Sequence, residues 1–220
     1  MQDFELFLFD FDGLLVDTER LHYQAYLRAL ESFGYLSNHS FVHFQQYAHQ
    51  NATAWKEALC KENKELNQCW DLLYQEKRKS YLNLLQTGQL ELMPGVEKVL
   101  LDLERRGAKR CVVTHSVLEH VQLIRAQLPM LNTIPHWITR EDYEHPKPHP
   151  ECYLKAIALF GEPNDRIVGF EDSLRGLQAL QATSAFAIWV CPPNHPLLRG
   201  VAAMQSPRFG TLLEAYQHKE

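Results

Sequence analysis

Two aspartates, one residue apart, end one of the most apolar stretches of this chain. Asp10 and Asp12 follow the segment FELFLF (residues 4–9), and Gly13 comes directly after them. Alternate side chains of an extended strand point the same way, so both carboxylates would face one side, and the glycine allows a sharp turn beyond them. A carboxylate that is buried without a partner is costly. The pattern therefore indicates a site where both carboxylates meet binding partners.

Further polar side chains stand at the ends of two later apolar segments. Thr114 and Ser116 follow one segment, Glu171 and Asp172 end another, and Lys147 lies in the proline-bracketed loop HPKPHP. If these segments are neighbouring parallel strands, their ends meet at the sheet edge where α/β proteins bind ligands. Clustered carboxylates raise one another's pKa values, and a divalent cation removes that conflict. An oxygen-only ligand set of this kind favours Mg²⁺.

This set of side chains suits phosphoryl transfer. One carboxylate can attack phosphorus and form an aspartyl-phosphate, and a second can protonate the leaving oxygen and later activate water. Mg²⁺ and Lys147 would neutralise negative charge, while the hydroxyls of Thr114 and Ser116 would hold phosphoryl oxygens. We therefore expect an enzyme that acts on a small phosphorylated metabolite.

The segments that carry these residues alternate with helical patterns. Strand-like apolar runs occupy residues 4–9, 108–115, 165–172 and 184–191, with a weaker candidate at 136–139. Between them, hydrophobic residues recur at helical spacing, as in Val96, Val99, Leu100 and Leu103. Strands and helices in alternation predict right-handed βαβ units. The expected fold class is α/β, with a doubly wound, Rossmann-like parallel sheet.

The stretch after the first strand departs from this alternation, because it holds helical patterns and no convincing strand. Helices are expected near residues 23–33, 53–60 and 66–86, with an irregular loop at 36–50. We therefore expect residues 1–16 and 92–220 to form the catalytic core, and residues 17–91 to form an inserted helical cap. An insertion at the ligand-binding edge of the sheet would act as a lid.

Composition limits the partners and the location of the chain. The net charge of −5 gives no support to nucleic-acid or membrane-surface binding, and no apolar run approaches the ~18 residues of a membrane span. The first residues are acidic, unlike the basic start of a signal peptide. The 5 cysteines form no CxxC pair, which favours reduced thiols. We expect a soluble, cytoplasmic monomer.

Four motifs, taken in order, resemble those of the haloacid dehalogenase-like hydrolase superfamily. They are DFDGLLVDT (10–18), VVTHS (112–116), KPHP (147–150) and GFEDS (169–173). The resemblance extends over essentially the whole chain and is to the branch with a helical cap after the first strand. It implies a Mg²⁺-dependent phosphatase that forms an aspartyl-phosphate intermediate.

The resemblance also implies a role for each motif residue. Asp10 would be the nucleophile and Asp12 the general acid and base. Thr114 and Lys147 would stabilise the phosphoryl group or the nucleophile. The Mg²⁺ ligands would be the Asp10 carboxylate, the Asp12 backbone carbonyl and the Asp172 carboxylate, with Glu171 as a further ligand or a partner of the ligands.

Two residues of the expected cap invite a role in substrate binding. Lys77 interrupts an apolar helical stripe, where it is either a snorkelling side chain or a substrate contact. In the beta-phosphoglucomutase relatives that this chain resembles, a histidine at the position of His22 and a lysine at that of Lys77 act on sugar phosphates. Asn51 stands where those mutases carry arginine, and His115 where relatives often have asparagine. A phosphatase is therefore the main expectation, and a sugar-phosphate mutase is the alternative.

Overall fold

The structure is a computed structural model that describes residues 1, 3–48, 53–192, 195 and 206–218. The chain divides into two compact units. One unit contains Thr18–Gln89 and is helical. The other contains Met1–Asp17, Leu90–His195 and the C-terminal segment, and it holds the β-sheet.

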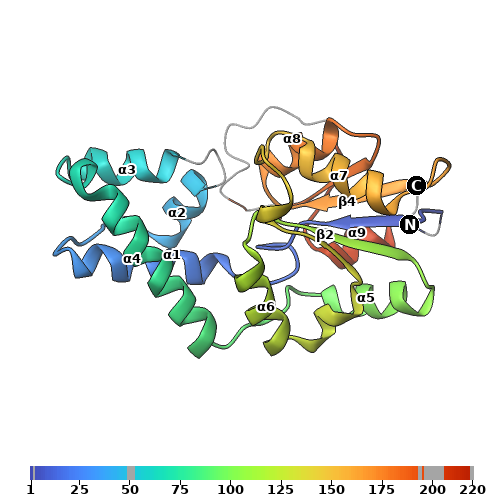
Figure 1. Cartoon of the computed structure of the whole chain (residues 1–220), viewed down its shortest axis with the longest axis horizontal. Coiled ribbons are helices and arrows are strands. Elements are labelled where there is room, and N and C mark those ends of the chain that lie inside the picture. Colours follow the sequence, from blue (N-terminus) through green and yellow to red (C-terminus); the bar gives the residue numbers. More distant parts are fainter. Residues whose placement is uncertain (2, 49–52, 193–194, 196–205, 219–220) are drawn as a thin grey trace. The chain divides into compact units, whose positions relative to one another are not determined.

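The larger unit is built on a six-stranded sheet of order β3-β2-β1-β4-β5-β6, in which every neighbouring pair is parallel (Figure 1). The strands are β1 (Leu6–Phe9), β2 (Lys109–Val113), β3 (His136–Ile138), β4 (Ile167–Glu171), β5 (Phe186–Val190) and β6 (Arg208–Phe209). This confirms the predicted doubly wound parallel sheet. Because β1 lies between β2 and β4, the strands that carry the polar ends are direct neighbours.

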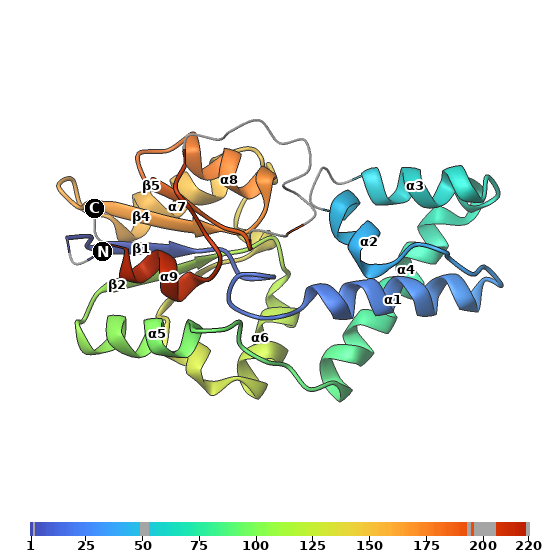
Figure 2. The same ribbon diagram turned by 180° about the vertical axis from the view of Figure 1, so that it is seen from behind.

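Helices cover both faces of this sheet, which explains its apolar central strand. One face carries α5 (Val96–Arg105) and α6 (Leu118–Gln127), and the other carries α7 (Glu151–Phe160) and α8 (Leu174–Gln181), as Figures 1 and 2 show. Two 3₁₀ turns, η1 (Pro129–Thr133) and η2 (Arg140–Asp142), and the terminal helix α9 (Leu212–Gln217) complete the unit. All four side chains of β1 are fully buried, as expected for a strand covered on both faces.

The smaller unit consists of α1 (Glu19–Ser32), α2 (Phe41–Ala48), α3 (Ala54–Glu62) and α4 (Leu66–Thr87). Its helices bury a shared apolar core made of Ala29, Leu30, Phe44, Trp55, Leu59, Cys60, Leu66, Trp70 and Leu73. Within the described part of the chain, no helix combines the length and apolar character needed to cross a membrane.

The sequence prediction was wrong for the loop at 36–50 and missed the last two elements. Part of that loop is α2, whose Phe44 packs edge-on against Trp55 and near Tyr26. Tertiary packing of this kind stabilises helices that are too short to form alone. β6 has only two residues, too few for an alternating pattern of apolar and polar residues to be detected. It forms by pairing with β5, where Val190 lies opposite Phe209.

Candidate active site

The ends of β1, β2 and β4 bring the predicted core residues to one edge of the sheet. Asp10 directly follows β1, Thr114 follows β2, and Glu171 ends β4. The Asp10 N–H donates to the Phe170 carbonyl at 3.0 Å, so pairing with β4 continues past the strand and fixes the backbone there. Gly13 has φ of +85°, a left-handed conformation that favours glycine, and it turns the chain just after Asp12.

Lys147 is the centre of a buried polar network. Its Nζ lies within hydrogen-bond distance of four acceptors: Asp10 Oδ1 at 2.5 Å, Glu171 Oε1 at 2.6 Å, the Val113 carbonyl at 2.9 Å and the Tyr153 hydroxyl at 3.1 Å. The Tyr153 hydroxyl in turn donates to the same Glu171 oxygen. The ammonium group therefore joins residues that follow or end three different strands and the helix α7.

Burial and charge act in opposite directions on the pKa values of this network. Burial opposes the charged form of Lys147, but the facing Asp10 and Glu171 carboxylates reverse that effect and raise its pKa. Burial raises the pKa of Asp10, and Lys147 offsets part of the shift. The pKa of Glu171 is raised by burial and by repulsion from Asp10. Lys147 is therefore the charge that allows two carboxylates to be buried side by side.

Asp12 has a different environment from Asp10. Its side chain is half-buried, and its Oδ2 accepts a hydrogen bond from Ser116 Oγ at 2.6 Å and another from Thr114 Oγ1 at 3.3 Å. The Ser116 N–H donates to Thr114 Oγ1 at 2.9 Å, which ties the two hydroxyl residues together. The turn after β2 thus presents two hydroxyl groups to one carboxylate.

Three carboxylates form a group that could hold a metal ion. One oxygen of each of Asp10, Glu171 and Asp172 lies within 4.8 Å of the others. The Asp172 backbone is held by Trp189, whose Nε1 donates to its carbonyl at 2.9 Å. These all-oxygen donors fit Mg²⁺. Glu171 Oε1 accepts hydrogen bonds from Lys147 and Tyr153, and Asp10 Oδ1 accepts one from Lys147.

Sequence reasoning missed three residues that shape this site. Tyr153 falls on an apolar helical pattern, and the signal that could have identified it is the hydroxyl that it carries on a fully buried face. Gly176 in α8 leaves room for Glu171, because a Cβ there would overlap its carboxylate. Glu151 accepts hydrogen bonds from the backbone N–H groups of Glu144 and His145, both at 2.8 Å, and so fixes the start of the Lys147 loop.

His22 and Lys77 lie side by side in the helical unit. Lys77 Nζ is 2.8 Å from His22 Nδ1, and His22 stacks on Tyr81 with ring centroids 3.9 Å apart. The ammonium group also lies 4.9 Å from the Tyr81 ring centroid and 5.1 Å from that of Tyr26, within cation–π range. Asn51, where the mutases have arginine, lies outside the described residues.

The chain is similar to known proteins over most of its length. Residues 4–183 match the haloacid dehalogenase-like hydrolase family. The chain is 30% identical over 194 residues to a probable pseudouridine-5'-phosphatase of Drosophila melanogaster, covering 85% of this chain and 81% of that protein. It is 26% identical over 188 residues to a phosphorylated carbohydrates phosphatase of Thermotoga maritima, covering 84% of each. Among solved structures, CbbY from Rhodobacter sphaeroides in complex with phosphate aligns with a TM-score of 0.74 at 20% identity, covering 96% of both chains.

The matched region includes every strand-end residue described above, from Asp10 to Asp172. The fold is shared with CbbY over nearly the whole of both chains. The predicted family is therefore confirmed: the chain belongs to the haloacid dehalogenase-like hydrolase family.

Proposed function

We propose that the protein is a Mg²⁺-dependent phosphatase that hydrolyses a small phosphorylated metabolite through an aspartyl-phosphate on Asp10. The observation that carries the proposal is the contrast between the two carboxylates after β1. Asp10 is buried against Lys147, whereas Asp12 is half-buried and accepts hydrogen bonds from Thr114 and Ser116. Two neighbouring carboxylates in unlike surroundings can divide nucleophilic and acid–base roles between them.

The reaction follows from these positions in two steps. An Asp10 oxygen attacks phosphorus and forms an O–P bond, while the bond from phosphorus to the leaving oxygen breaks and that oxygen takes a proton from Asp12. Asp12 then removes a proton from water, which attacks the same phosphorus, breaks the bond to Asp10 and releases inorganic phosphate. Lys147 favours the ionised form of Asp10, and the hydroxyls of Thr114 and Ser116 bind phosphoryl oxygens.

The divalent cation would be held by the Asp10 and Asp172 carboxylates and the Asp12 backbone carbonyl, with Glu171 as a further ligand or as the partner of Lys147. Bound there, Mg²⁺ would neutralise the charge of the phosphoryl oxygens and of the nucleophile. The oxygen-only character of the group formed by Asp10, Glu171 and Asp172 supports this choice of ion.

The helical segment 17–91 serves as a cap that selects the substrate of the catalytic core, residues 1–16 and 92–220. The contact between His22 and Lys77 supports this role, because Lys77 is buried beside a histidine and tyrosines and is therefore not an ordinary solvated lysine. The named activities of the two sequence relatives, on pseudouridine-5'-phosphate and on phosphorylated carbohydrates, favour a phosphorylated nucleoside or sugar as substrate.

The working form is a cytoplasmic monomer, which light scattering and cell fractionation would test.

A screen of phosphate release over phosphorylated nucleosides and sugars, with Mg²⁺ present, tests the proposed function. We expect turnover of at least one such compound, loss of turnover in excess chelator, and recovery when Mg²⁺ is added back. Full turnover in excess chelator would exclude a requirement for a divalent metal ion. If the folded protein released phosphate from none of these compounds, the proposed phosphatase activity would be contradicted.

A sugar-phosphate mutase is the second candidate, and the paired His22 and Lys77 favour it. A mutase returns the phosphoryl group to a sugar instead of to water, so it needs a sugar bisphosphate as primer. Assays of isomer formation with and without such a primer separate the two activities. Isomer formation that depends on the primer and exceeds phosphate release would replace the phosphatase with the mutase.

A further inference from the structure

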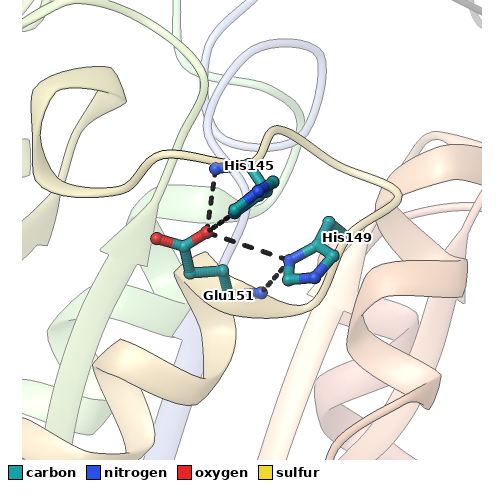
Figure 3. Close-up of side chains that lie close together, drawn as sticks. All are labelled: His145, His149 and Glu151. Carbon is teal, nitrogen blue, oxygen red and sulfur yellow. Dashed lines mark hydrogen bonds and ion pairs between the residues drawn. The ribbon is translucent and has the colours of Figure 1, made fainter.

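A second group of metal-binding side chains lies in the loop that carries Lys147. His145, His149 and Glu151 are close together at the start of α7, and Figure 3 shows both imidazole rings beside the Glu151 carboxylate. His145 Nδ1 is 2.7 Å and His149 Nδ1 is 3.9 Å from Glu151 Oε2. One ligand atom of each residue lies within 4.8 Å of the others.

The carboxylate of this group is fixed before any ion arrives. Glu151 Oε1 accepts the Glu144 N–H and Oε2 accepts the His145 N–H, both at 2.8 Å. Oε1 has a further lone pair that an ion can use, and at Oε2 an ion would replace the contact with His145 Nδ1. The two rings lie with centroids 4.7 Å apart, and 60% of the His145 side chain and 53% of the His149 side chain are exposed. An ion can therefore reach all three groups from solvent.

The donor set selects the kind of ion. Two imidazole nitrogens and one carboxylate oxygen form a set typical of Zn²⁺, which takes three protein ligands and a water in tetrahedral geometry, whereas Mg²⁺ prefers oxygen alone. Bonds of about 2.0–2.2 Å in a tetrahedron place ligand atoms roughly 3.3 Å apart. His145 Nδ1 and Glu151 Oε2, which are 2.7 Å apart, must therefore move slightly apart to admit the ion. His149 needs a small ring rotation, which releases its long contact, 3.3 Å, with the Glu151 N–H.

We propose that His145, His149 and Glu151 form a surface site for Zn²⁺, separate from the carboxylates at the strand ends. The ion would link the two ends of the loop that bears Lys147. It would thereby stabilise the folded unit, since a metal that binds only the folded state raises the stability of that state. The site does not depend on the proposed phosphatase activity.

Competition with a chromogenic zinc chelator, in excess Mg²⁺ to occupy the strand-end carboxylates, tests the site. His149→Gln removes one ligand from an exposed position, and His145→Gln is the second test variant. His43→Gln is the matched control, because it removes another exposed histidine that lies four residues from a neighbouring histidine, His39.

We expect the wild type and His43→Gln to bind one zinc ion more than either test variant, or to bind it at least about tenfold more tightly. Zinc should also raise the melting temperature of the wild type and of His43→Gln, and raise it less in His149→Gln. Equal stoichiometry and affinity in the wild type and both test variants would overturn the site. So would a wild type that binds no zinc under these conditions.

Discussion

The network around Lys147 predicts strong energetic coupling between Lys147 and Glu171. Coulomb's law, at an effective dielectric constant of about 20, gives roughly 6 kcal/mol for unit charges separated by 2.6 Å, the distance from Lys147 Nζ to Glu171 Oε1. Asp10 shares the same ammonium group at 2.5 Å and burial opposes all three charges, so only part of this energy is net stabilisation.

Three variants resolve that coupling in a double-mutant cycle. Lys147→Met leaves two buried carboxylates facing each other and should lower the free energy of unfolding by about 3–5 kcal/mol. Glu171→Gln keeps Lys147 paired with Asp10 and should cost about 1–3 kcal/mol. The double variant should be more stable than the sum of these losses implies, by about 2–3 kcal/mol, because a neutral amide in place of the Glu171 carboxylate removes the repulsion.

Urea denaturation with chelator present, so that no cation replaces the ammonium group, measures the cycle. The exposed pair Lys79–Glu76, separated by 3.2 Å, is the control and should couple by at most about 0.5 kcal/mol. A coupling between Lys147 and Glu171 as small as that of the control would refute the buried network as a source of stability.

Gly176→Ala should lower the free energy of unfolding by about 1–3 kcal/mol, because the alanine Cβ would overlap the Glu171 carboxylate. This loss should occur although alanine normally favours a helix. A variant that urea denaturation shows to be more stable than the wild type would contradict this packing. Ser116→Ala removes the shorter hydroxyl contact to Asp12 and should lower kcat/KM about tenfold, whereas unchanged kinetics would remove Ser116 from the reaction. Lys77→Ala should lower kcat/KM by about tenfold or more on the substrate found in the screen and barely affect an aryl phosphate, whose leaving group needs no cap contact. Equal losses on both substrates would assign Lys77 to the fold or to the chemistry.

The sheet and its polar strand ends could be predicted from the sequence because both signals are local. A strand covered on both faces is apolar at every position, as β1 is, and the residue after its last apolar position is the first that can meet a ligand. Asp10, Thr114 and Glu171 could therefore be assigned to one edge from the amino-acid sequence alone. Only the parallel neighbours of β1 were needed to bring them together.

The contacts that were missed depend on partners that the local sequence pattern does not identify. The role of Tyr153 requires Glu171, 18 residues later, and α2 is held by Phe44 packing against Trp55. Glu151 reads as an ordinary acidic residue at a helix start until its hydrogen bonds to the backbone of the Lys147 loop are known. Spacing along the chain carries no information on such pairings, because they are set by how helices and loops meet.

The central claim is that Asp10 carries the phosphoryl group, and trapping that intermediate tests it most directly. Asp12→Asn should slow the second step, while an aryl phosphate needs no acid to leave, so the phosphoenzyme should accumulate in this variant. Acid quenching after incubation with a ³²P-labelled aryl phosphate, followed by peptide mapping, locates the label. We predict label on the peptide that contains Asp10 and none when Asp10→Asn is added to Asp12→Asn. Label on another residue, or turnover by Asp10→Asn at near-normal rates, would contradict the mechanism.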